Sequence, residues 1–290
     1  MHRIDIFNKT YMVPSSFTEI STKQALAVLP YIISPPQHPE ELAKAQAQVL
    51  YRLLPIYNYQ WRKLATPANA GALNSMLQLT NFLFETPGTK PLFTEFRFNG
   101  VQYLLPSDKL SNCSLIEYAF ADKALTGILA LDNSPKNEAK KLEAITRIVA
   151  ILCRPMRTDV DLQSPEYEGD PREKFSTPLV EHRVQIFKKL PLHIKQAVFL
   201  YFVAGRKWLH ENFKVLFDNR EPNEPETKNI PFGKTKLNAP DFGWMGVIFQ
   251  LAESGVFGPF DQVKHFFLHT ACYHMAQKAY AYYAQLDANK

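Results

Sequence analysis

The alternation of apolar and polar side chains predicts two short β-hairpins. Four segments have the two-residue period of a strand: residues 4–7, 10–13, 93–98 and 101–105. Asn8 and Lys9 form the predicted turn of the first hairpin. Asn99 and Gly100 form that of the second, and this dipeptide is the strongest short signal for a two-residue hairpin turn because both positions need positive φ.

Most of the remaining chain has apolar side chains at helical spacing. Two helix starts carry a capping box, Ser21 with Gln24 and Ser114 with Glu117, in which each side chain accepts from the other residue's backbone N–H. Predicted helices cover about residues 22–32, 39–54, 69–84, 115–131, 138–153, 177–187, 192–217, 241–254 and 259–286. The predicted fold class is therefore mainly α with small β-hairpins, and a helical bundle forms its C-terminal part.

The segments that contain the two hairpins resemble each other. Residues 7–15 align with residues 98–107 when one residue is inserted, and both segments end in Pro-Ser ahead of predicted helices. Residues 1–155 thus form a predicted hairpin-plus-helices region, either as two repeats (1–90 and 91–155) or as hairpins that only share turn chemistry. A polar linker (156–176) and a helical domain (177–290) with a mobile loop (218–240) complete the predicted organisation.

Composition and charge narrow the class of protein. The chain of 290 residues is 46% hydrophobic and 21% charged, which excludes a mainly disordered chain. It shows no signal peptide and no membrane span, and its three cysteines are scattered, so we expect a cytoplasmic protein with reduced thiols. The net charge is +5, and residues 179–217 carry an equal excess, with seven basic and two acidic residues.

Candidate catalytic and metal-binding residues are few. His265, His269 and Cys272 share one face of the last predicted helix, but structural zinc sites almost always have four protein ligands. Asp159 and Asp161 form an Asp-x-Asp pair in an acidic segment, where solvation is the simpler interpretation. The sequence contains no P-loop, GxGxxG after a strand, GxSxG or HExxH motif, so we expect no enzyme activity, no cofactor and no bound metal.

Two surfaces are candidates for binding a partner. Large rings recur on the last predicted helix at Phe266, Tyr273 and Tyr280, with Tyr283 beside them; they either contact a partner or cover the protein's own core. Lys207, His210 and Lys214 fall on one face of helix 192–217 and could attract nucleic acid or an acidic partner, although the bland interpretation is a solvated face.

Five segments resemble tail-morphogenesis proteins of tailed bacteriophages and prophages: YMVPSSFTEI (11–20), FRFNG (96–100), ILCRP (151–155), FGWMGVI (242–248) and LAESGVFG (251–258). The resemblance implies a tail assembly chaperone or minor tail component without catalytic residues. Such a protein would hold apolar segments of another tail protein, such as the tape measure, until polymerisation. It would act in the host cytoplasm or the virion, as a monomer or homo-oligomer. Nucleic-acid binding through residues 179–217 is the alternative.

Protein purified without chelator should contain no stoichiometric zinc, because three ligands on one helix leave the coordination shell open. Elemental analysis measures this directly. One equivalent of zinc that is lost in the variant His269→Ala would show the prediction to be wrong.

Overall fold

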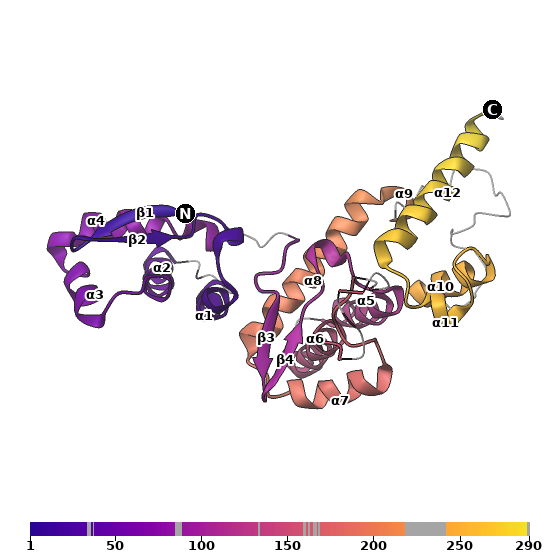
Figure 1. The fold of residues 1–290 in the computed structure, drawn as a ribbon, viewed down its shortest axis with the longest axis horizontal. Helices are drawn as coiled ribbons and strands as arrows, with labels where there is room; N and C mark the ends of the chain where they lie inside the picture. Colours follow the sequence, from indigo (N-terminus) through magenta and orange to yellow (C-terminus); the bar gives the residue numbers. More distant parts are fainter. Residues whose placement is uncertain are drawn as a thin grey trace.

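The computed structural model describes residues 1–33, 36, 38–84, 89–132, 134–158, 161, 163–164, 167, 169–217 and 242–288, with the side chains of residues 18 and 286–288 left out. Within these residues the chain is mainly helical with two small antiparallel sheets, as predicted (Figure 1). None of the described helices combines the length and apolar character needed to cross a membrane.

The first unit, residues 1–84, begins with the hairpin of β1 (His2–Ile6) and β2 (Lys9–Val13). Its turn is Phe7–Asn8, with φ of 48° and 62°, so the predicted turn at Asn8 and Lys9 is wrong by one residue. Both registers put the apolar residues of the two strands on the same face, so the alternation alone does not fix the turn. The Lys63 Nζ lies 5.0 Å from the centre of the Phe7 ring.

Four helices complete the first unit: α1 (Thr22–Ile32), α2 (Pro39–Leu53), α3 (Asn58–Leu64) and α4 (Ala70–Gln78). The Ser21 capping box forms as predicted, and α1 packs against α2. The single helix predicted over 69–84 is wrong, because α4 stops and a 3-10 turn (Asn81–Phe84) follows. At this break the buried Thr80 hydroxyl donates to the Leu77 carbonyl, which satisfies a helix-end acceptor.

The second unit, from residue 89 to residue 155, has a third strand. Strands β3 (Glu95–Phe98) and β4 (Val101–Leu104) form the predicted hairpin, with Asn99 and Gly100 at φ of 49° and 81°. The short strand β5 (Arg154–Pro155) pairs antiparallel with the outer edge of β4. Helices α5 (Leu115–Leu129) and α6 (Glu138–Leu152) pack against each other, and α5 starts at the predicted Ser114 capping box.

The two units share the order hairpin, 3-10 turn, capping-box helix and second helix of 15 residues, and the second unit has a further 3-10 turn (Pro135–Asn137) between its two helices. Aligned on their turns, residues 6–15 match residues 98–107 without an insertion, and Tyr11 coincides with Tyr103. The second helices also end alike, at Leu54 (φ −94°, ψ 124°) and Cys153 (φ −93°, ψ 110°). The order of elements agrees with a repeat, whose origin stays a prediction.

The C-terminal part is helical: α7 (Thr177–Phe187), α8 (Leu192–Asn212), α9 (Lys214–Phe217), α10 (Gly243–Glu253), α11 (Phe260–Val263) and α12 (Leu268–Ala288). The long helix predicted over 192–217 breaks at Phe213, whose φ and ψ of −116° and 43° are not helical. The predicted mobile loop 218–240 lies outside the described residues.

The last predicted helix, 259–286, is two helices. Between α11 and α12, two backbone carbonyl groups accept hydrogen bonds from the start of α5. The Leu115 N–H donates to Phe266 O and the Ile116 N–H donates to Lys264 O, both at 2.9 Å. The Leu268 N–H in turn donates to Cys113 O at 2.9 Å. Because the first N–H groups of a helix have no partner within it, these contacts replace helical bonds at 264–268.

One large apolar core includes residues from α1 to α12 and crosses the boundary predicted at 156–176. A smaller cluster around Ile6, Val13 and Leu50 holds the first hairpin to α2 and α4. Helix α1 contributes to the large core and contacts α8, so it joins the first unit to the rest of the molecule.

A buried ionic network lies within the large core. Glu117 on α5 is fully buried and accepts from Arg172 Nη1 at 2.7 Å and from Arg154 Nη2 at 2.8 Å. Asp170 binds the same two guanidinium groups, at 2.8 Å from Arg172 Nε and 3.0 Å from Arg154 Nη2. Two carboxylates thus neutralise two arginines. The end of the predicted polar linker is therefore part of the core, since Arg172 is completely enclosed.

Arg172 also binds the backbone of two segments that are distant in the chain. Its Nη1 donates to Leu152 O at the end of α6, and its Nη2 donates to Asn112 O ahead of α5, both at 2.9 Å. Burial opposes the positive charge, but Glu117 and Asp170 hold the pKa of Arg172 above the usual arginine value. Beside this network, Arg183 on α7 donates to Ala150 O at 2.9 Å and pairs with Glu173 at 2.6 Å.

The variant Arg172→Met should lower the free energy of unfolding by about 3–5 kcal/mol, because it leaves Glu117 and Asp170 with only the Arg154 guanidinium between them and removes the donors to Leu152 O and Asn112 O. The matched control is Arg147→Met, which removes a pair with Glu181 on the surface of α6 and should cost less than about 1 kcal/mol. Urea denaturation of the two variants measures both values. Equal losses would show that the network does not bear on stability.

Candidate partner-binding site

Helix α12 exposes two of the four rings that the sequence suggests as a partner surface, Tyr273 and Tyr280. Its last buried side chains are Met275 and Ala276, and no described side chain from 277 to 285 is buried. Figure 1 shows this part of the helix extending away from the body of the protein. Tyr273 and Tyr280 are 63% and 62% exposed, which is high for such large rings.

The four predicted ring residues do not form one stripe. Phe266 precedes α12 and packs on Phe257 with ring centres 4.7 Å apart, so it belongs to the edge of the core. Tyr273 meets the Phe213 ring edge-on at 5.0 Å, while its remaining surface is open. Tyr283 is half-buried and stands against Tyr282. The seven-residue spacing is therefore shared on α12 by Tyr273 and Tyr280 alone.

The predicted basic face is weakened by local pairing. Lys207 is exposed, but its Nζ lies 3.7 Å from Glu211 Oε1. The His210 ring stacks on the Phe217 ring, with the ring centres 4.0 Å apart. Burial lowers the pKa of His210, with nearby Arg206 adding to the effect, so both disfavour a positive charge on this ring. Lys214 lies on α9, beyond the break at Phe213.

Two of the seven bases in the segment 179–217 are buried. Arg183 pairs with Glu173, and Lys195 donates to Lys188 O at 3.2 Å. Arg206 pairs with Asp122 at 2.6 Å. The other four bases, Lys188, Lys189, Lys207 and Lys214, are exposed, so the fold uses three of the seven cations.

The predicted His-Cys grouping is dispersed. His269 contacts Lys109 O at 2.8 Å and stacks on Trp208, and burial lowers the pKa of its ring. His265 is exposed and precedes α12, whereas Cys272 is buried inside the helix packing. Within the described part of the chain, no three His, Cys, Asp or Glu side chains converge to hold a metal ion. Asp159 lies outside the described residues.

The three cysteine thiols are held as neutral SH groups. Cys113, Cys153 and Cys272 are all buried. Burial raises the pKa of Cys113 and Cys153 well above the ordinary value and that of Cys272 to about 12. Since the thiolate is the nucleophile, none of these groups is activated.

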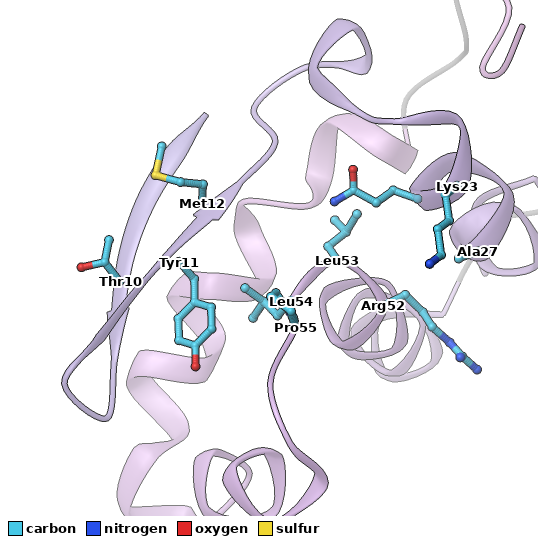
Figure 2. Close-up of a pocket in the computed structure, with 10 residues that line it drawn as sticks. Thr10, Tyr11, Met12, Lys23, Ala27, Arg52, Leu53, Leu54 and Pro55 are labelled. Carbon is cyan, nitrogen blue, oxygen red and sulfur yellow. The ribbon is translucent and has the colours of Figure 1, made fainter.

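A groove in the first unit was not predicted from the sequence. It has a volume of about 540 Å³ and lies between β2, the start of α1 and the end of α2 (Figure 2). Leu53 and Leu54 are buried beneath it, and the exposed cations Lys23 and Arg52 line it. Sequence patterns missed this site because it is formed by three segments that are distant in the chain.

Duplex DNA or RNA should bind more weakly than about 1 µM at physiological salt, because the four exposed lysines of residues 179–217 are divided between the two ends of α8 and so form no continuous basic surface. Fluorescence anisotropy over a series of salt concentrations measures this. Submicromolar binding that falls steeply with salt and is lost in the double variant Lys207→Gln, Lys214→Gln would favour the nucleic-acid alternative.

Comparisons of the chain with protein-family models, with curated proteins and with solved structures found no match. The contacts and exposed surfaces of the folded chain are therefore the basis for the function proposed below.

Proposed function

We propose that this protein acts by protein–protein contact, as an assembly protein of bacteriophage tails, and that the projecting part of α12 binds its partner. The observation that carries the proposal is the pair of exposed rings, Tyr273 and Tyr280, on a helix that leaves the body of the protein (Figure 1). The resemblance of five sequence segments to tail-morphogenesis proteins supplies the biological setting.

The chemistry of these rings suits a transient partner. Tyrosine offers a large apolar surface and a hydroxyl that remains hydrated, so it can be exposed in the free protein and still contribute to an interface. Aromatic side chains dominate the binding energy of many protein interfaces. An apolar helical segment of another tail protein, such as the tape measure, is the partner that this surface would hold before polymerisation.

The position of the rings also separates binding from stability. Tyr280 lies beyond the last buried side chain of α12. Tyr273, in contrast, packs against the ring of Phe213 and so contacts the folded body of the protein. Loss of the Tyr280 ring should therefore leave the core unchanged. Loss of a core ring would instead cost about 3–5 kcal/mol of stability.

The variant Tyr280→Ala should weaken partner capture or self-association about 30-fold, which corresponds to about 2 kcal/mol, and should leave the melting temperature nearly unchanged. The measurement is co-purification of the tagged chain with products of the genes beside its own, together with sedimentation of the chain alone. Tyr59→Ala is the matched control, since Tyr59 is 68% exposed in the first unit.

Three results would contradict the proposal. Equal binding by the Tyr280→Ala and Tyr59→Ala variants would remove α12 from the interface. A large fall in melting temperature in the Tyr280→Ala variant with unchanged binding would assign the ring to the protein's own packing. Co-purification with no tail-module product would remove the phage role.

A further inference from the structure

The outer edge of β2 carries unpaired backbone groups. A two-residue hairpin closed by the pair Ile6 and Lys9 turns the N–H and C=O of every second residue toward the partner strand. The groups of Thr10 and Met12 therefore point away from β1. No backbone hydrogen bond joins them to any other segment that the structure describes.

This edge faces the groove. Thr10, Tyr11 and Met12 line it from one side, while β1 contributes no residue, so the groove lies on the side of β2 away from β1. Figure 2 shows Leu54 and Pro55 across from the strand. An unpaired edge beside a groove is the arrangement that accepts an added strand in proteins that bind extended peptides.

The second unit shows what fills the equivalent position. There Arg154 and Pro155, which follow α6 after the single residue Cys153, pair with Leu104 and Tyr103 on the outer edge of β4. In the first unit the segment that follows α2 begins with Leu54 and Pro55 and does not pair. Counted from the two helix ends, Pro55 stands where Arg154 stands, and proline has no N–H to donate to a sheet.

The charged side chains beside the two sheet edges differ in sign. In the second unit the capping-box residue Glu117 accepts from Arg154 of the bound strand at 2.8 Å. The corresponding capping-box residue of the first unit is the neutral Gln24, which lines the groove beside Lys23 and Arg52. No acidic side chain lines the groove, and neither cation has a carboxylate within ion-pair distance among the described residues.

We propose that the groove binds an extended acidic peptide of a partner protein, which pairs with the edge of β2 at Thr10 and Met12 and places carboxylates near Lys23 and Arg52. The peptide takes the place that β5 takes in the second unit, with the charges exchanged. Its alternating residues are apolar, because Leu53 and Leu54 form the floor. This surface is remote from α12, so the inference goes beyond the proposed function and does not depend on it.

The probe is a short labelled peptide of alternating valine and glutamate, and its binding to the full chain is measured by fluorescence anisotropy. The peptide should bind, and a peptide with lysine in place of glutamate should not. The double variant Lys23→Gln, Arg52→Gln should weaken binding about tenfold. Lys44→Gln, which changes an exposed cation of α2 outside the groove, is the matched control and should have no effect.

Backbone pairing is tested on the peptide, so that protein folding is not disturbed. Methylating the amide nitrogens of every second residue should abolish binding for one of the two alternate sets and spare it for the other, because only one set faces β2. The variant Thr10→Pro, which removes an outward N–H, should also abolish binding. Circular dichroism verifies that this variant is folded.

The proposal is overturned if no acidic peptide binds, if the lysine peptide binds equally well, or if both methylated sets behave alike. It is also overturned if the wild-type chain is a dimer that Thr10→Pro converts to a monomer while the peptide has no effect. That result would assign the edge of β2 to a second copy of the chain.

Discussion

The enclosed charge of Arg172 is the constraint on which the main body depends. A guanidinium without water must have its donors satisfied, and here the acceptors come from α5, the end of α6, the segment ahead of α5 and Asp170. One side chain therefore joins α5, the end of α6 and the segment ahead of α5. The apolar side chains of the large core pack around this hydrogen-bonded network.

The comparison between the two units shows how a small chemical change alters a sheet edge. Both have a hairpin, a capping-box helix and a second helix of equal length, yet among the residues that the structure describes only the second unit has a third strand. Arg154 offers an N–H to the sheet and a guanidinium to Glu117, whereas Pro55 offers neither. The outer edge of the hairpin is thus paired with a third strand in the second unit and unpaired in the first.

The sequence predicted correctly the elements that depend on interactions between residues close together in the chain. Both capping boxes, the turn at Asn99 and Gly100, and helix α7 agree with the sequence, since each depends on residues a few positions apart. The break between α11 and α12 could not be found in this way, because it results from hydrogen bonds to α5, about 150 residues earlier. Because of this break, the prediction that Phe266 lies on the last helix is wrong: that helix begins two residues later, at Leu268. The groove beside β2 and the role of Arg172 likewise require contacts that no spacing within the chain reveals.

The pairing of residues 264–268 with the start of α5 also has a consequence for the order in which the protein is made. Leu115 and Ile116 find their acceptors only in a segment that leaves the ribosome about 150 residues later. At about 5–20 residues per second, synthesis of that stretch takes roughly 8–30 seconds. During this interval the N–H groups of Leu115 and Ile116 are open to water, while the Ser114 capping box already satisfies that of Glu117. The first unit, whose small cluster lies within residues 6–77, can close early, but the large core is completed only when nearly the whole chain has been translated.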